Sequence, residues 1–575
     1  MAIDWNKKEE QEQFWHSSAH LMAAAIMELY PDTKTTIGPA IEEGFYYDFD
    51  VKTPFTPNDF EKINEKMKEI VKKNQRFERK EISKKEALDL FKDNKYKTEL
   101  INELPENETI STYTNGNYTD LCRGPHIDYT SRIKAIKIVK TSSAYWRADA
   151  KRESLQRLYG ISFPKKELME EYTKQKEEAE KRNHLKLGKE LDLFSMHEES
   201  PGCAFFHPKG MVIWNQLMEF WRHEHLKAGY GEVNTPVILK KKLWVQSGHW
   251  DHYKDNMYFT KIDEEDYAIK PMNCPGGMLV YKTKRYSYRD FPLRVGEVGT
   301  VHRHELSGVL NGLFRVRKFT QDDAHIFCMP EQINSEVQGV IDLIDKIYST
   351  FGFSYKMELS TKPEDAMGSQ EIWNNAENSL KSALEEKGLE YKINPGDGAF
   401  YGPKIDFHIK DSLGRNWQCA TIQLDFAMPE KFDLTYIDKE DKQQRPVMLH
   451  RVVFGSLERF IGILTEHYAG VFPLWLSPLQ VKIIPISEKF KDYAEKINSE
   501  LLEANIRSEI DCKTETVSYR IRNAQLEKVP YIINVGEKEE QVNTVAVRDR
   551  KGKVEFGIKK EDFVKRLLKE IAEKK

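Results

Sequence analysis

The chain has 575 residues, enough for three or four domains of ~150 residues each. Hydrophobic residues make up 39% and charged residues 31%, as in an ordinary globular protein. The formal net charge of -4 does not exclude a polyanionic partner, because an acidic protein can carry a local basic surface.

No feature of the sequence indicates a membrane protein or a secreted one. The first residues lack a basic segment followed by an apolar one, and no later segment approaches the ~18 apolar residues of a membrane span. The six cysteines are scattered and form no CxxC pair, which suits a reducing compartment. We therefore expect a cytoplasmic protein without membrane partners.

The first predicted element is a helix in FWHSSAHLMAAAIMELY, where apolar residues recur at helical spacing until Pro31 ends it. Two histidines four residues apart then lie on one face of this helix. Later, the Gly-Pro pair in LCRGPH folds the chain so that a cysteine and a histidine come within reach of each other. The four side chains are His16, His20, Cys122 and His126. Their spacing predicts a four-ligand metal site, and the alternative is that they carry out a cleavage reaction.

Composition and periodicity divide the chain into three domains. Residues 1–182 mix the first helix, Gly/Pro turns and short strands, which indicates an α+β domain ending in a charged connecting helix within 165–198. Residues 183–477 show strand after strand with few helices between, so we expect a largely antiparallel sheet. Residues 478–575 alternate strands and helices and predict a small α/β domain. The fold class is α+β and α/β in a multidomain chain.

An arginine in the predicted helix 455–468 has apolar neighbours around most of the helix circumference. Such an arginine requires a partner, because a buried unpaired charge costs several kcal/mol. Spacing alone favours a carboxylate such as Glu458 as the partner of Arg459. The alternative partner is a phosphate, which the guanidinium group fits.

Residues 300–328 form the second charged segment. They are predicted to be two strands around the short loop Asn311-Gly312, a strong hairpin signal. The hairpin carries more charge than a structural one needs, in Arg303, Arg315, Arg317 and Glu305, although an exposed salt-bridged surface is the simpler interpretation. The chain contains no GxxxxGK[ST] motif, so a nucleotide would have to be held by side chains rather than by a P-loop.

These segments carry a specific resemblance. HRHE, RVRKFTQDDAH and GSLERF resemble motifs 2 and 3 of class II aminoacyl-tRNA synthetases, and VNTPV resembles motif 1. More narrowly, KPMNCPG, GAFYGPKIDF, WQCATIQLDF and VMLHRVVFGSLERFIGILTE are similar to the threonyl-tRNA synthetase family, in the form that lacks a small extra N-terminal domain. The match extends from about residue 10 to the C-terminus, with Gly277 and Lys318 departing from the usual residues.

The resemblance implies a zinc site, one ion per subunit, that spacing alone would not group. Its ligands would be Cys274, His325 and His450. Three protein ligands and one open position define a substrate-binding zinc. The amine and hydroxyl of L-threonine would complete the shell, with Asp323 accepting from the hydroxyl, so that valine would be rejected.

The resemblance also implies how ATP is held with magnesium. Arg303 would contact the α-phosphate, Glu305 the adenine amine and Arg459 the γ-phosphate of a bent ATP. The resemblance implies that six further residues contact the amino acid, the adenylate or ATP: Gln321, Tyr401, Lys404, Arg315, Gln418 and Gln423. Threonyl-adenylate would form first, and tRNA(Thr) would then accept the threonyl group.

Serine lacks only one methyl group of threonine, which is worth ~1–3 kcal/mol of discrimination, or about 10- to 200-fold. The resemblance therefore implies a second site, in the first domain, that hydrolyses seryl-tRNA(Thr). Its positions are His16, His20, Cys122, His126, Lys97, Asp120 and Tyr47. In this family the site is understood to hold a water without metal, contrary to the spacing-based prediction.

For the third domain the resemblance implies anticodon binding. The candidate residues are Arg522, Lys528, Glu539 and Arg548, each otherwise a solvated surface charge. Motif 1 implies a homodimer. Two other functions compete with the ligase: a non-catalytic RNA-binding paralogue, and a structural zinc protein built on HSSAH and LCRGPH.

Overall fold

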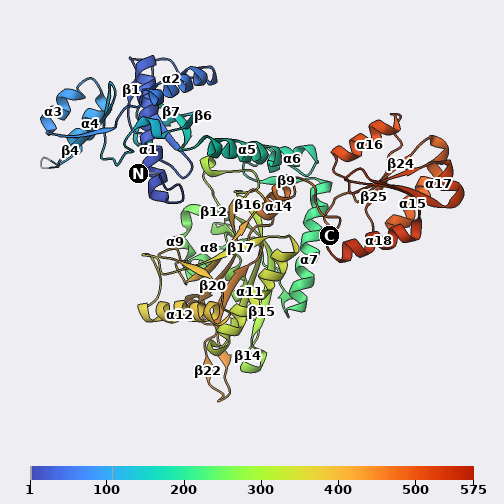
Figure 1. The fold of residues 1–575 in the computed structure, drawn as a ribbon. Helices are drawn as coiled ribbons and strands as arrows, with labels where there is room; N and C mark the ends of the chain where they lie inside the picture. The colour runs from blue at the N-terminus through green and yellow to red at the C-terminus, as the bar shows by residue number, and fades with distance from the viewer. Residues whose placement is uncertain (1–2, 106–107, 150) are drawn as a thin grey trace. The chain divides into compact units, whose positions relative to one another are not determined.

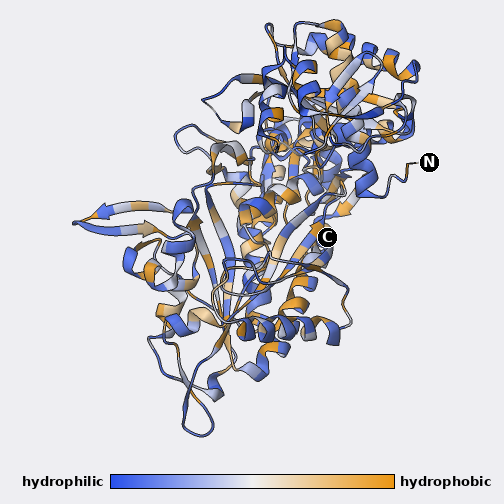
Figure 2. Cartoon of the chain, turned by 90° about the vertical axis from the view of Figure 1, so that its left-hand side faces the viewer, coloured by the Kyte–Doolittle hydropathy of each residue, from blue (hydrophilic) through white to orange (hydrophobic). Residues whose placement is uncertain are grey.

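The computed structural model describes residues 3–105, 108–149 and 151–575. Contacts divide the chain into two compact units, Met1–Glu177 and Glu178–Lys575 (Figure 1). Among the described residues no helix is long and apolar enough to span a membrane, and hydrophilic residues interrupt the apolar ones along the helices (Figure 2).

The N-terminal unit is built around helix α1 (Lys8–Leu29), which ends just before Pro31 as predicted. Its buried side chains pack with α2 (Phe60–Lys72) and an antiparallel sheet in the order β1-β2-β7-β6. The strands are β1 (Lys34–Thr35), β2 (Phe45–Asp50), β6 (Ala135–Tyr145) and β7 (Ser154–Phe163). A smaller sheet comprises β3 (Glu78–Ile82), β4 (Ile110–Asn115) and β5 (Tyr118–Leu121), with helices α3 (Lys84–Leu90) and α4 (Lys95–Glu103). Helix α5 (Lys166–Arg182) follows, within the predicted connecting segment.

The second unit contains an eight-stranded sheet in the order β10-β15-β16-β23-β20-β19-β17-β18. The central pairings are antiparallel, as predicted, and the two outermost pairs are parallel. The strands are β10 (Gly231–Glu232), β15 (Leu293–His302), β16 (Lys318–Cys328), β17 (Ser354–Ser360), β18 (Tyr391–Asn394), β19 (Lys404–Lys410), β20 (Asn416–Asp425) and β23 (Val447–Val452). Its apolar residues form the largest core cluster of the chain.

The prediction of few helices in this region was wrong. Long helices contribute buried residues to the core, because sequences such as INSEVQGVIDLIDKIYST place apolar residues on one helical face. They are α7 (Pro208–Lys227), α11 (Ile333–Thr350), α12 (Gln370–Glu386) and α14 (Leu457–His467), and the short α10 (Cys274–Tyr281) precedes β15.

The hairpin prediction was also wrong. Strand β15 ends at His302 and β16 begins at Lys318, so most of the two strands predicted around Asn311-Gly312 is a long loop. Strands β15 and β16 pair antiparallel beyond this loop, from Leu293–Phe327 to His302–Lys318. A tertiary contact holds this loop, since Leu313 N donates to His184 Nε2 at 3.0 Å. A Cβ on Gly312 would lie 2.2 Å from the same nitrogen, so glycine is needed for this approach rather than for a tight hairpin.

The C-terminal part of the second unit is a five-stranded sheet in the order β25-β24-β26-β27-β28 with its own apolar core. Its strands are β24 (Val481–Pro485), β25 (Ser508–Ile510), β26 (Tyr531–Val535), β27 (Thr544–Asp549) and β28 (Val554–Lys559). Its helices are α15 (Lys491–Glu503), α16 (Val517–Leu526), α17 (Glu537–Val542) and α18 (Lys560–Ala572). Strands and helices alternate as predicted.

Candidate active site

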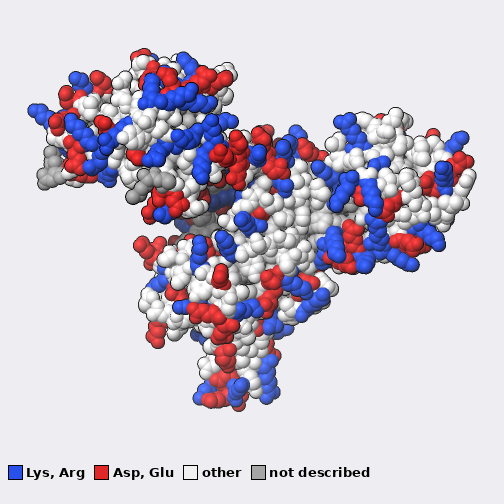
Figure 3. Space-filling view, viewed as in Figure 1, with Lys and Arg blue, Asp and Glu red and all other residues white. Residues whose placement is uncertain are grey.

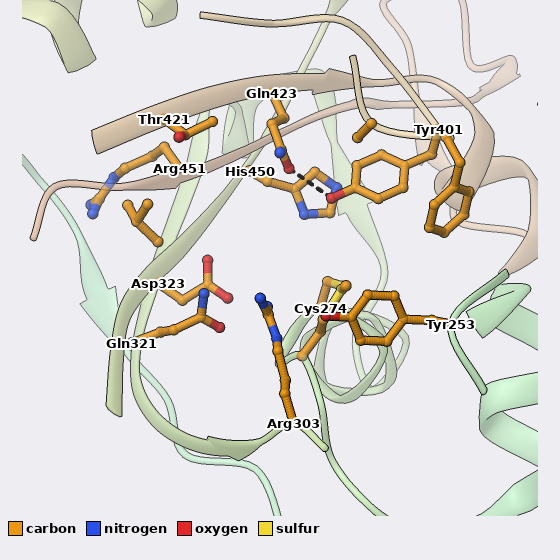
Figure 4. A pocket seen from close by; sticks show the side chains of 14 residues that line it. Tyr253, Cys274, Arg303, Gln321, Asp323, Tyr401, Thr421, Gln423, His450 and Arg451 are labelled. Carbon is orange, nitrogen blue, oxygen red and sulfur yellow. Dashed lines mark hydrogen bonds between the residues drawn. The ribbon is translucent and has the colours of Figure 1, made fainter. Parts of the chain in front are cut away.

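A cavity of about 350 Å³ opens on the face of the large sheet formed by β16, β20 and β23 (Figure 4). The side chains that line it come from these strands, from α10 and the segment just before it, from the residue after β15, from the loop 399–402 and from Tyr253. Those singled out by the sequence are Cys274, Arg303, Gln321, Asp323, Tyr401, Gln423 and His450.

Strand pairing brings two histidines together. His325 in β16 lies directly opposite His450 in β23, so that both side chains leave the same face of the sheet and the ring centroids are 5.0 Å apart. Cys274 joins them as the first residue of α10. Their ligand atoms all lie within 4.8 Å of one another, and all three residues are buried.

The donor atoms of this group fit a metal ion. The buried Nε2 of His325 has no hydrogen-bond partner among the described residues, which is costly unless an ion is bound there. His450 uses its Nε2 for Asp425 Oδ2 at 2.8 Å, which leaves Nδ1 for a metal. A cysteine with two histidines is a donor set that zinc accepts, with one position left open.

Asp323 lies beside this group, two residues before His325 on the same face of β16. Its Oδ2 accepts from Asn273 Nδ2 at 3.2 Å, and burial raises its pKa. On the opposite wall Tyr401 donates to Gln423 Oε1 at 2.6 Å (Figure 4). A small polar ligand therefore meets a carboxylate on one side and a tyrosine on the other.

Arg303 reaches into the cavity between Asp323 and Cys274 (Figure 4). Its Nε donates to Pro271 O at 3.2 Å, and its guanidinium carbon lies 5.1 Å from the ring centroid of Phe319. These contacts fix the stem and leave the terminal nitrogens directed at the cavity. The group is placed to meet an anion there.

Arg459 does not pair with Glu458, so the carboxylate partner favoured by spacing was wrong. Its Nε donates to Phe314 O at 2.9 Å and its NH1 to Gln418 O at 3.3 Å. Glu458 points elsewhere, accepting from Thr320 N at 2.8 Å and Lys318 Nζ at 3.4 Å. Backbone carbonyls hold the guanidinium of Arg459 without neutralising it.

A second group of the same chemistry lies in the N-terminal unit. His16, His20, Cys122 and His126 place their ligand atoms within 4.8 Å of one another. Three of these side chains contact one another, since Cys122 Sγ lies 3.2 Å from His126 Nε2 and 3.4 Å from His16 Nε2, whereas the buried Nδ1 of His20 has no hydrogen-bond partner among the described residues. His126 Nδ1 contacts Ser17 Oγ at 3.1 Å, and this hydroxyl donates to Gln13 O, so His126 carries its proton on Nδ1.

A buried ion pair borders this second group. Lys97 Nζ lies 2.5 Å from Asp120 Oδ1, while Tyr47 donates to Asp120 Oδ2 at 2.5 Å. Burial works to raise the pKa of Asp120, but Lys97 and His20 outweigh it, so the pKa is lowered and the carboxylate is ionised. His20 Nδ1 is 3.6 Å from the same carboxylate.

The histidines here are neutral. Burial lowers the pKa of His20 to about 3 and also lowers the pKa values of His16 and His126. Burial raises the pKa of the Cys122 thiol to about 11. The group therefore offers neutral imidazoles, whose ring nitrogens can accept a hydrogen bond from water, beside one anionic carboxylate.

Comparisons with known proteins match both the part of the chain that holds the cavity and part of the N-terminal unit. Residues 258–468 match the tRNA synthetase class II core domain (G, H, P, S and T), residues 480–570 the anticodon binding domain, and residues 110–159 the threonyl and alanyl tRNA synthetase second additional domain. The chain is 59% identical over 566 residues to the threonine–tRNA ligase of Acetivibrio thermocellus, which covers 98% of this chain and 89% of that protein. It is 57% identical over 575 residues to that of Syntrophomonas wolfei, covering 100% and 90%.

The chain belongs to the threonine–tRNA ligase family. Two solved structures agree with this. The RNA binding domain of threonyl-tRNA synthetase from Cryptosporidium parvum matches with a TM-score of 0.66 and 42% identity, covering 67% of this chain and 98% of that one. A putative threonyl-tRNA synthetase from Aeropyrum pernix matches with a TM-score of 0.60 and 30% identity, covering 68% and 97%. The resemblance stated from the motifs is thus confirmed, as are the fold class and the enzyme class.

Several of the family positions lie outside the cavity lining. Lys404 is paired with Asp397 at 3.0 Å and Asp406 at 2.8 Å, and Gln418 Nε2 donates to Asp406 Oδ1 at 2.6 Å. Glu305 and Arg315 pair with each other at 2.9 Å in the loop between β15 and β16. The cavity also has lining residues that the sequence analysis did not name: Tyr253, Met272, Ala399, Phe400, Thr421, Arg451 and Val452.

The alternation of side chains along a strand could have identified one of these additional lining residues. Thr421 lies two residues before Gln423, so both side chains leave the same face of β20. The distant Tyr253 had no signal in the sequence.

The anticodon candidates are spread over the C-terminal sheet and helices. Arg522 is exposed on α16 and Lys528 follows that helix. Glu539 on α17 accepts from Gly536 N at 3.1 Å, and Arg548 on β27 donates to Gly552 O at 3.0 Å. Two of the four therefore already have structural partners.

Proposed function

We propose that this threonine–tRNA ligase activates L-threonine with ATP in the cavity on the large sheet, transfers it to tRNA(Thr), and hydrolyses seryl-tRNA(Thr) at the His/Cys group of the N-terminal unit. The observation that carries the proposal is the buried group Cys274, His325 and His450 beside Asp323. A cavity of about 350 Å³ suits an amino acid at this position.

Cys274, His325 and His450 would hold one zinc ion per subunit. When bound, zinc would supply a Lewis acid with an open position for the polar groups of threonine. Asp323 would accept a hydrogen bond from the threonine hydroxyl. A ligand with a methyl group in that place leaves Asp323 unsatisfied, and such sites reject it strongly because a buried polar group then has no partner.

Arg303 and Arg459 would contact the phosphates of ATP, which brings magnesium with it. Neither guanidinium group is neutralised by a carboxylate among the described residues, so each can stabilise negative charge that develops during adenylation. Glu305 would accept from the adenine amine, with Arg315 at its side. Tyr401, Gln321, Gln423, Gln418 and Lys404 would line or support the adenylate site.

In the N-terminal unit a neutral histidine, His16 or His20, would accept a proton from the water that attacks the seryl ester. Asp120, ionised and held by Lys97 and Tyr47, would stabilise the positive charge that the histidine then gains. We propose that no metal takes part. In support, Cys122 Sγ contacts His16 Nε2 and His126 Nε2, so three of the four candidate ligands already hydrogen-bond to one another, whereas His325 Nε2 has no hydrogen-bond partner within the described ranges.

The remaining assignments are proposed on the same basis. The domains are residues 1–182, 183–477 and 478–575, and the last binds the anticodon through Arg522, Lys528, Glu539 and Arg548. The assembly is a homodimer through the segment around Pro236.

The test of the ligase is threonine-dependent exchange of pyrophosphate into ATP by the purified full chain. We expect exchange with threonine, none with valine, and one zinc per chain by metal analysis. Cys274→Ala should lose both zinc and exchange. Cys328→Ala, which removes another buried cysteine of the same unit, is the matched control and should keep both.

The same measurements exclude the competing functions. A non-catalytic paralogue would show no exchange in the parent chain. A structural zinc protein would keep its metal in Cys274→Ala and lose it in His16→Ala.

A further inference from the structure

A buried histidine and a buried glutamate of the second unit have no role in the proposed function so far. Figure 3 shows acidic and basic side chains spread over the visible surface of the protein, where water solvates them. His184 is the first residue of α6 (His184–Glu190), and Glu466 lies near the end of α14. Their side chains are only 2% and 3% exposed. A buried polar network is costly unless each member has a partner, and a fully paired one fixes the elements that it joins.

Both ring nitrogens of His184 have a defined partner. Leu313 N donates to Nε2 at 3.0 Å, so this nitrogen carries no proton and the ring proton is on Nδ1. Nδ1 donates to Glu466 Oε1 at 2.7 Å, and the backbone N of His184 donates to the same oxygen at 2.9 Å. Burial works to raise the pKa of Glu466, but His184 and Arg415 outweigh it, so the pKa is lowered and the carboxylate is an ionised acceptor.

The histidine thereby joins α14 to the long loop between β15 and β16. Its ring packs on Phe314 in that loop, with the ring centroids 4.1 Å apart. The carbonyl oxygen of Phe314 accepts the hydrogen bond from Arg459 Nε at 2.9 Å. Arg459 and Glu466 are both in α14, about two turns apart, so they lie on the same side of that helix. The contacts therefore form a closed ring through His184, Leu313, Phe314, Arg459 and Glu466.

We propose that His184 is a positioning residue for ATP: it fixes the carbonyl of Phe314 and, through this carbonyl, the guanidinium group of Arg459. The inference rests on the proposed function, which assigns Arg459 to the phosphates of ATP. Among the described residues no carboxylate pairs with Arg459, and two backbone carbonyls hold its guanidinium group. One of them belongs to a loop whose place depends on distant contacts such as the bond from Leu313 N to His184. Displacing that carbonyl would displace the charge that meets the phosphates.

The test separates the two hydrogen bonds of the His184 ring by two substitutions in the full chain. In His184→Gln the side-chain amide reaches the place of Nε2 and can accept from Leu313 N. In His184→Asn the shorter amide reaches only the place of Nδ1 and can donate to Glu466. Each variant thus loses one buried hydrogen bond and keeps the other. His223→Asn, at an exposed histidine of α7, is the control for the substitution itself.

Binding of ATP with magnesium is measured directly by titration, and the KM values for ATP and threonine by pyrophosphate exchange. We expect His184→Asn to weaken ATP binding and to raise the KM for ATP by about 10-fold, the factor that the loss of one buried hydrogen bond corresponds to. The KM for threonine should not change, because the bond from Leu313 N supports the phosphate-binding arginine and not the zinc site. His184→Gln and His223→Asn should bind ATP as the parent does.

Two results would overturn the proposal. One is equal ATP binding in His184→Asn and His184→Gln, and the other is a rise in the KM for threonine as large as the rise for ATP. Either result would mean that the histidine only stabilises the fold. A parent chain that binds ATP but shows no threonine-dependent exchange would refute the proposed function alone, and a parent chain that binds no ATP would refute both.

Discussion

The buried pair Lys97–Asp120 allows the sharpest prediction about the N-terminal unit. The side chains are 3% and 2% exposed and 2.5 Å apart. In Lys97→Met the Asp120 carboxylate keeps the hydrogen bond from the Tyr47 hydroxyl but loses the ammonium group that balances its charge. Removing one partner of a buried pair costs about 3–5 kcal/mol, because the other charge is left uncompensated.

The cost depends on pH with a definite sign. Without Lys97, burial raises the pKa of Asp120 above its unfolded value, so the variant is penalised at neutral pH. The penalty disappears as the pH falls below the unfolded pKa, since both states are then protonated. The difference in stability between parent and variant should therefore be greatest near pH 7 and should shrink as the pH falls through the unfolded pKa of Asp120 and then through its lowered pKa in the folded parent.

Differential scanning calorimetry of the full chain measures this, because the two units are compact and should unfold in separate transitions. A loss of 3–5 kcal/mol lowers the midpoint of the N-terminal transition by about 6–20 °C for a unit of this size. Exchange of pyrophosphate should be unaffected, and hydrolysis of seryl-tRNA(Thr) should fall.

Lys97→Met combined with Asp120→Asn is the control that separates charge from packing. A neutral pair should recover most of the lost stability without recovering hydrolysis. If Lys97→Met melts within 1–2 °C of the parent at pH 7, or if the double variant is no more stable than the single one, the reasoning from the buried charge is refuted.

Three further predictions concern single groups. Asp425→Asn weakens the hydrogen bond that orients His450 and should lower zinc affinity by about 10- to 100-fold in a chelator competition, whereas unchanged affinity would contradict the assigned orientation. Because burial lowers the pKa of His20 to about 3, seryl-tRNA hydrolysis should show no protonation step near pH 6.5; a rate that halves near that pH would place a solvated histidine in the reaction. Asp322 accepts from the amides of 453–455 at 2.9–3.0 Å, in the turn that leads to Arg459. Asp322→Asn should therefore raise KM for ATP and leave KM for threonine unchanged, and an effect on threonine alone would count against this role.

Local spacing predicted the N-terminal group because it consists of two pairs, and the members of each pair are close in sequence. HSSAH lies on one helix, and Cys122 and His126 flank a turn. The pair His325 and His450 had no such signal, since their proximity comes from the pairing of β16 with β23. Only the family motifs connected them.

The partner of Arg459 could not be predicted for a related reason. It donates to the carbonyls of Phe314 and Gln418, and a backbone carbonyl is the same for every residue type. The Asn311-Gly312 signal failed because His184 imposes a tertiary contact on the loop. Local propensity is overridden where distant side chains supply the hydrogen bonds.

The register of β16 against β23 has a consequence for how the enzyme assembles. Shifting either strand by one residue would turn its histidine to the opposite face of the sheet, because side chains alternate along a strand. An ion that needs both histidines and Cys274 as ligands can therefore bind only when β16 and β23 pair in this register. Metal binding would then stabilise the correct register of these two strands over registers shifted by one residue, before any amino acid binds.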